Sequence, residues 1–288
     1  NKEGMGHIRL GRYNQLEIVK EVDFGVYLDG DEDGEILLPK RYVPQGCQVG
    51  DILNVFIYLD MEERLVATTI EPYAQVGDFA YLQVAWVNQY GAFLDWGLMK
   101  DLFVPFREQK EKMVKGKSYL VYIYIDDESF RIMASAKIEH FLSDEFPEYQ
   151  NDECVDILVW KRTDLGFKVI VDNQYSGLIY KSDIFQPISV GMSLKAYIKQ
   201  VREDGKIDLT LQKSGMEKVA NFSQDLYQYV KMNQGFVSMN DKTDAELIYK
   251  TFGVSKKTFK KAVGDLYKKR LIKIEPNGLR LLDNGDEE

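Results

Sequence analysis

The sequence predicts a mainly β protein that ends in a smaller α+β domain. Up to about residue 215, short runs rich in Val, Ile, Tyr and Phe are separated by Gly and Asp, which is typical of strands and tight turns. One cassette of such runs occurs three times, and beyond it apolar residues recur at helical spacing. A chain of 288 residues is also too long for one ordinary core. The expected domains span residues 1–72, 73–145, 146–215 and 216–288.

The repeated cassette carries a glycine next to aromatic residues between its first two strands. These glycines are Gly25, Gly91 and Gly166, which lie 66 and then 75 residues apart. A third apolar strand, a loop and a closing strand pair follow in each copy. An all-β unit of this length with five strands has the size of an OB-type barrel, which closes on itself and so leaves no sheet edge. The sequence therefore predicts three tandem five-stranded OB-type barrels.

The C-terminal region has the pattern of a winged helix. Phe222, Leu226 and Val230 lie at helical spacing and predict a first helix that ends near Gly235. A second helical stretch stops at Gly253, and Ser255 is a good N-cap for a third. Asn277-Gly278 between two apolar runs predicts a terminal hairpin. Three helices and a hairpin make a winged-helix domain.

These motifs carry a resemblance to known domains. The three units resemble S1 RNA-binding domains, in which an aromatic-Gly-small-aromatic element precedes a Gly-Leu-Val-His strand and an Asp-x-x-x-Arg closing turn. Asp60 with Arg64 and Asp127 with Arg131 match that turn, whereas proline replaces the histidine in the first two copies. As a whole, the chain resembles the bacterial family typified by conserved virulence factor B, with consecutive S1 domains before a winged helix. The resemblance implies an RNA-binding protein that acts in post-transcriptional regulation of gene expression.

The resemblance also implies a binding face on each barrel. Such faces stack bases on aromatic rings and hold phosphates with cations. The third helix of a winged helix usually meets the nucleic acid, and its lysines form one face without an interleaved acid. The candidate nucleic-acid-binding residues are Phe24, Tyr27, Arg64, Tyr90, Phe93, Arg131, Phe167, Lys168, Tyr180, Arg202, Lys206, Lys256, Lys257, Lys260 and Lys261. The alternative interpretation is structural: half-buried sheet aromatics, plain surface ion pairs and a solvated lysine face.

The four expected domains that carry these candidates differ in net charge. The net charge of −9 is distributed as −7, −3, −1 and +2 over the four expected domains. Copy one also carries an acidic run around residues 29–35, which repels phosphate over roughly 8 Å at physiological salt. We therefore expect single-stranded RNA to bind with little sequence preference, mainly between barrel three and the winged helix, with help from barrel two.

Other function classes have little support in the sequence. With only His7 and His140, and two distant cysteines, we expect no catalytic residues, no metal site and no cofactor. No apolar run has the roughly 20 residues of a membrane helix, and we expect a cytoplasmic protein without a membrane partner. Two alternatives remain: a winged-helix regulator that binds DNA, and an adaptor whose acidic N-terminal barrels dock a protein.

Overall fold

The computed structural model describes residues 8–184, 186–212 and 216–282, without the side chains of residues 216–218 and 220; His7 lies outside this part. The described chain forms three closed five-stranded barrels, then three helices with a three-stranded sheet. The predicted fold class is confirmed. The chain divides into two compact units, Asn1–Leu142 with barrels one and two and Ser143–Glu288 with the rest. The expected domain boundaries stay predictions. No helix in the described residues is long and apolar enough to cross a membrane.

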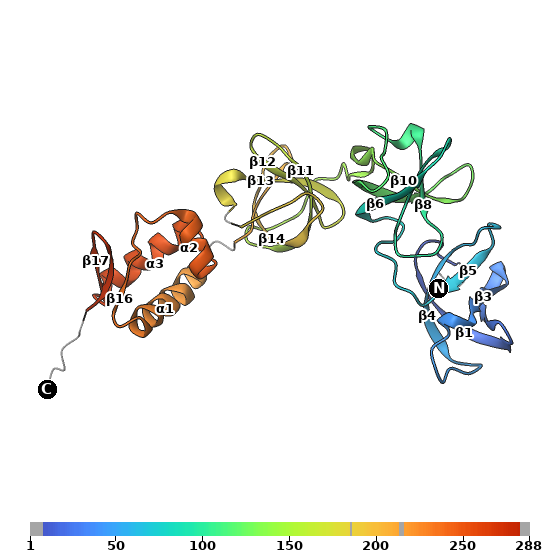
Figure 1. The fold of residues 1–288 in the computed structure, drawn as a ribbon, viewed down its shortest axis with the longest axis horizontal. Coiled ribbons are helices and arrows are strands. Elements are labelled where there is room, and N and C mark those ends of the chain that lie inside the picture. The colour runs from blue at the N-terminus through green and yellow to red at the C-terminus, as the bar shows by residue number, and fades with distance from the viewer. Residues whose placement is uncertain (1–7, 185, 213–215, 283–288) are drawn as a thin grey trace. The chain divides into compact units, whose positions relative to one another are not determined.

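Barrels one and two belong to the first unit (Figure 1). The strands of barrel one are β1 (Tyr13–Val22), β2 (Gly25–Asp29), β3 (Glu35–Pro39), β4 (Ile52–Leu59) and β5 (Leu65–Thr68). Those of barrel two are β6 (Phe79–Val87), β7 (Gly91–Leu94), β8 (Leu102–Pro105), β9 (Ser118–Ile125) and β10 (Ile132–Ser135). In each, the third strand pairs in parallel with the fifth, and this pairing closes the barrel.

Barrel three repeats this order in the second unit. Its strands are β11 (Cys154–Arg162), β12 (Gly166–Val171), β13 (Tyr175–Tyr180), β14 (Ser193–Val201) and β15 (Ile207–Thr210). The parallel pair is again the third strand with the fifth, here β13 with β15. Alternate residues of the strands fill the interior, in which Val159, Val169 and Leu209 are fully buried. The period of two in the sequence is therefore the period of the barrel core.

The repeated glycine has a steric reason in every barrel. Gly25, Gly91 and Gly166 have φ of 151°, 155° and 153°, a range that side chains rarely adopt. A Cβ atom on Gly91 would lie 2.3 Å from the carbonyl oxygen of Val104 in β8. The corresponding distances to the neighbouring strand are 2.2 Å at Gly25 and 1.9 Å at Gly166. Only glycine lets the first two strands turn so close to the third.

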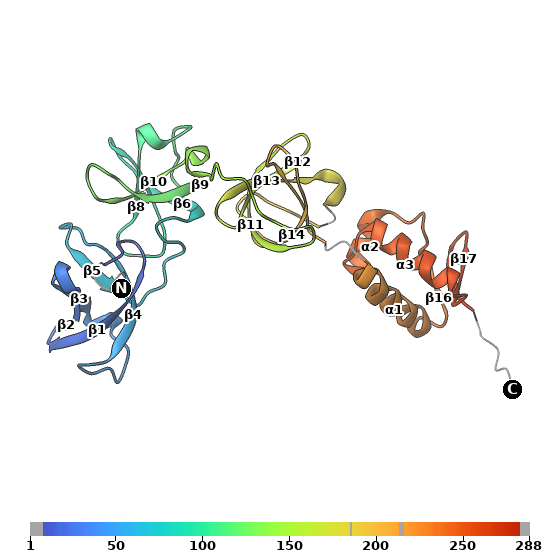
Figure 2. The same cartoon turned by 180° about the vertical axis from the view of Figure 1, so that it is seen from behind.

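The C-terminal domain is the expected winged helix. Its elements are α1 (Met216–Met232), β16 (Phe236–Val237), α2 (Ala245–Phe252), α3 (Lys256–Lys268), β17 (Ile272–Glu275) and β18 (Gly278–Leu281). The Ser255 hydroxyl accepts a hydrogen bond from the Thr258 N–H at 3.1 Å, which confirms the predicted N-cap of α3. Helices α1 and α3 lie side by side in both views (Figures 1 and 2) and share a core that includes Leu226 and Phe259. This packing leaves the lysine side of α3 outside the core.

Candidate nucleic-acid interface

Three aromatic rings lie in contact on the outer face of barrel two. Trp86 of β6 stacks on Phe93 of β7, with ring centroids 3.8 Å apart and planes only 4° from parallel. Phe103 of β8 continues the row, with its centroid 5.0 Å from that of Phe93. The indole N–H of Trp86 donates a hydrogen bond to Oδ2 of Asp101 at 2.9 Å, which holds its ring in place. We call Trp86, Phe93 and Phe103 the ring platform.

The backbone register creates this platform. Phe93 pairs with Trp86 across one strand boundary and with Phe103 across the other. The pairing of β6 with β7 shifts by one residue between Val84 and Trp86, and this bulge places Trp86 opposite Phe93. Because paired residues project on the same face of a sheet, the three side chains come together. Trp86 remains 43% exposed, so the platform has an accessible aromatic surface.

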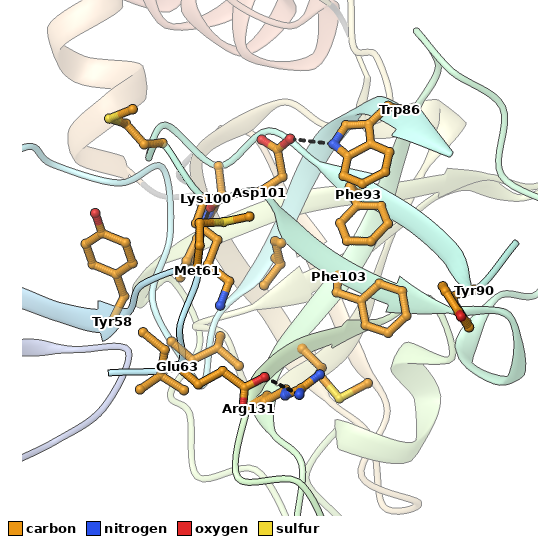
Figure 3. Close-up of a pocket in the computed structure, with 16 residues that line it drawn as sticks. Tyr58, Met61, Glu63, Trp86, Tyr90, Phe93, Lys100, Asp101, Phe103 and Arg131 are labelled. Atoms are coloured by element: carbon orange, nitrogen blue, oxygen red, sulfur yellow. Dashed lines mark hydrogen bonds and ion pairs between the residues drawn. The ribbon is translucent and has the colours of Figure 1, made fainter. Parts of the chain in front are cut away.

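The platform forms one wall of a pocket of about 650 Å³ in the first unit. Barrel one supplies Tyr58, Met61 and Glu63 to its lining, and Figure 3 shows these residues on the side opposite the platform. Of the expected site residues, Tyr90, Phe93 and Arg131 all line this pocket. Sequence reasoning missed Trp86, Phe103 and Met61. The two rings were detectable only as aromatics on neighbouring strands, and nothing in the sequence indicated Met61.

Charged groups surround the apolar centre of the pocket. Arg131 forms an ion pair with Glu63 of barrel one rather than with Asp127 of its own turn (Figure 3). Lys100 donates a hydrogen bond to the main-chain oxygen of Asp60 at 3.0 Å, and burial lowers the pKa of Lys100. The pocket thus offers both cations and carboxylates beside an aromatic surface, a set that can accommodate a base with its polar edge.

The corresponding outer face of barrel one carries a smaller aromatic surface than the ring platform. Phe24 is 57% exposed, and its ring centroid lies 6.2 Å from that of Tyr27. Lys20 lies where Trp86 lies in barrel two, with its ammonium 4.7 Å from the Tyr27 centroid. Arg64 pairs with Asp60 at 3.1 Å and with Glu62 at 3.1 Å. Two rings and an arginine shared by two carboxylates make a poorer base and phosphate site than the platform.

In barrel three, the expected cations contact side chains of the same barrel. Lys168 takes the position of Phe93, and both Lys168 and Lys161 lie 4.9 Å from the ring centroid of Trp160. Arg202 donates a hydrogen bond to the buried carboxylate of Asp208 at 2.9 Å and another to the Tyr180 hydroxyl.

The other two expected residues of barrel three, Phe167 and Lys206, also contact groups of their own barrel. Phe167 is half-buried and packs against the barrel core. The ammonium of Lys206 lies 3.8 Å from Asp204. Barrel three therefore carries cations on this face, with Lys168 in the place of Phe93.

The basic face of α3 is exposed as its spacing predicts. Lys257, Lys260 and Lys261 are exposed and Lys256 is half-buried, while Phe259 and Val263 of the same helix are in the core. None of the four lysines forms an ion pair with any residue in the described ranges. In contrast, Lys269 near the end of α3 pairs with Asp265 at 3.1 Å. The four lysines form a cationic surface suited to phosphate.

Comparisons with known proteins agree with this architecture. Residues 10–70 match the S1 domain family, and residues 224–281 match the CvfB-like winged helix domain. These are nucleic-acid-binding domain families and not enzyme families. The chain is 28% identical to protein YitL of Bacillus subtilis, over 91% of this chain and 90% of that protein. It is 21% identical to conserved virulence factor B of Staphylococcus saprophyticus, over 96% and 95%.

A solved structure covers a similar extent. A multidomain protein with nucleic acid binding domains from Streptococcus pneumoniae is 27% identical and covers 95% of this chain and 98% of its own, with a TM-score of 0.41. The family resemblance therefore rests on the two domain matches and on the relatives that extend over most of the chain. The predicted resemblance is confirmed: the chain carries an S1 domain and a CvfB-like winged helix domain, and it is similar to conserved virulence factor B over most of its length.

Proposed function

We propose that this protein binds single-stranded RNA with little sequence preference and acts in post-transcriptional regulation. The observation that carries the proposal is the ring platform, which presents the 43%-exposed Trp86 stacked on Phe93. Stacking on an aromatic ring contributes about 1–3 kcal/mol per base and accepts every base, because each has a π-face. Bases are free to stack in this way only in unpaired strands.

Phosphate contacts come from the second unit in this proposal. The lysine face of α3 has no ion-pair partner in the described residues, so binding phosphate there breaks no existing pair. Arg202 of barrel three, by contrast, already neutralises Asp208. Contacts on both units of one chain add avidity, because the second contact becomes intramolecular once the first has formed. The predicted site between barrel three and the winged helix remains part of this proposal.

A winged helix also accommodates duplex DNA, which is the second candidate function. The exposed side of α3 carries lysines but no Arg, Asn or Gln between Lys256 and Lys268 for bidentate contacts to base edges. Such a face binds the backbone of any nucleic acid and reads little sequence. In an intact duplex the bases are already paired and stacked, so none of them can stack on the ring platform. Both points favour single-stranded RNA over the DNA-regulator alternative.

Titration of the full chain with labelled nucleic acids tests the proposal. We expect a single-stranded oligoribonucleotide of mixed sequence to bind more tightly than a DNA duplex of equal length at every salt concentration. Different RNA sequences should bind with similar affinity. Trp86→Ala should weaken RNA binding and leave duplex binding unchanged. Tighter binding of the duplex, or an unchanged RNA affinity of the Trp86→Ala protein, would contradict the proposal.

A further inference from the structure

Barrels one and two pack on each other through an apolar cluster, which gives their facing surfaces a fixed geometry. Phe56 of β4 has its ring centroid 5.6 Å from that of Trp96 in barrel two and 5.5 Å from that of Tyr13 in barrel one. Phe56 and Trp96 belong to one apolar cluster, against which Tyr13 packs, and this cluster joins the outer side of β4 to the core of barrel two, while barrel one has a core cluster of its own. The hydrogen bond from Lys100 to Asp60 anchors the β4–β5 turn of barrel one, residues 60–64, to barrel two. The turn is thus held beside the ring platform.

One residue of this turn has a conformation that favours glycine. Glu63 has φ of 64°, and the corresponding turns contain Phe130 at 58° in barrel two and Gly205 at 82° in barrel three. The hydrogen bond from the Glu63 N–H to the Asp60 carbonyl oxygen at 3.0 Å closes the turn in this conformation, which is uncommon for a glutamate. Its side chain, however, reaches Arg131 in the pocket. The neighbouring Met61 is 83% exposed and also lines the pocket, opposite the platform.

We propose that this turn of barrel one completes the site of barrel two, so that the pocket encloses one unpaired nucleobase between the ring platform and Met61. The proposal rests on the proposed function and deepens it. One face of the base stacks on the exposed aromatic surface, and the thioether of Met61, a favourable partner for aromatic rings, covers the other. A volume of about 650 Å³ is ample for one nucleoside.

The polar groups at the rim suit the edge of a base. The carboxylates of Asp101 and Glu63 accept hydrogen bonds from amino groups, and Lys100 and Arg131 donate to carbonyl and ring nitrogen acceptors. An aliphatic ligand would use neither the stacked rings nor these groups. Barrel one thereby contributes through its turn and not through its own smaller aromatic face. Its acidic 3-10 helix, Asp31–Asp33, belongs to the β2–β3 connection and not to this turn.

The full chain with an oligoribonucleotide that contains one 2-aminopurine provides the test. Acrylamide quenching of this fluorescent base reports whether it is enclosed. The variant is Met61→Ala with Glu63→Gly, which removes the wall while glycine suits the backbone at residue 63. Glu62→Gln is the matched control, because Glu62 lies in the same turn, pairs with Arg64 at 3.1 Å and does not line the pocket.

We expect the wild-type protein and the Glu62→Gln control to shield 2-aminopurine from acrylamide. The double variant should lose this shielding and bind about tenfold more weakly, the effect of removing an apolar group from a pocket. If it binds and shields like wild type while Trp86→Ala binds weakly, the platform is an open surface; the inference fails and the proposed function stands. Tighter binding by the double variant means that the turn obstructs the platform, and also overturns the inference. If Trp86→Ala and the double variant both bind like wild type, both proposals fail.

Discussion

Truncation of the central ring of the platform provides the sharpest test of base stacking. In Phe93→Ala, Trp86 loses the ring that lies 3.8 Å from it and Phe103 loses the ring 5.0 Å away. One stacked base contributes about 1–3 kcal/mol, and every 1.4 kcal/mol is a factor of about ten in the dissociation constant. We therefore expect RNA affinity to fall by about fivefold to 150-fold.

Fluorescence anisotropy of a labelled oligoribonucleotide, repeated over a range of salt concentrations, measures this effect. The salt slope should stay unchanged, because Phe93 contacts no phosphate in this scheme and counterion release reports only charged contacts. Tyr27→Ala is the matched control, since Tyr27 occupies the same place in barrel one, where its only close ring is Phe24 at 6.2 Å among the described residues. Circular dichroism verifies that both variants are folded. Equal losses in the two variants, or an unchanged affinity of Phe93→Ala, would refute the reasoning.

Three further predictions concern charge, backbone strain and pH. Replacing Lys256, Lys257, Lys260 and Lys261 by Gln should reduce the salt slope of RNA binding by about 0.7 per lost phosphate contact, whereas Lys195→Gln, which removes a lysine paired with Asp156, should leave the slope as it is. Gly91→Ala should lower the free energy of unfolding, measured in urea, by about 1–3 kcal/mol, because its φ of 155° and the Val104 oxygen exclude a Cβ atom. A Cβ atom at Gly264 of α3 meets no atom within 4 Å, so Gly264→Ala should raise the free energy of unfolding by up to about 1 kcal/mol. Burial raises the pKa of Tyr124 to about 12, so its neutral form stabilises the fold below pH 10, and that contribution is lost as the pH rises toward 12. Urea unfolding of wild type and Tyr124→Phe at pH 9 and 11 should show a larger loss for wild type, and equal losses would contradict this.

The sequence by itself determined the fold and the number of its parts. Alternation with a period of two defines strands locally, and the three glycines mark turns where any side chain would collide with the next strand, as the 1.9 Å distance at Gly166 shows. The N-cap at Ser255 and the hairpin at Asn277-Gly278 are equally local features. Each of these signals lies within a few residues, so no tertiary information is needed to interpret them. The family resemblance depended on the same local motifs.

Only the tertiary structure decided which side chains meet at the candidate site. Trp86 faces Phe93 because a bulge shifts the register after Val84, and a bulge of this kind has no clear mark in the sequence. Arg131 pairs with Glu63 and not with Asp127, because an apolar cluster packs barrel one on barrel two and brings a distant turn to the pocket. The motif located the rings of barrel two, whereas long-range packing determined what surrounds them. Packing between domains depends on the shapes of whole surfaces, which a repeat within one domain does not encode.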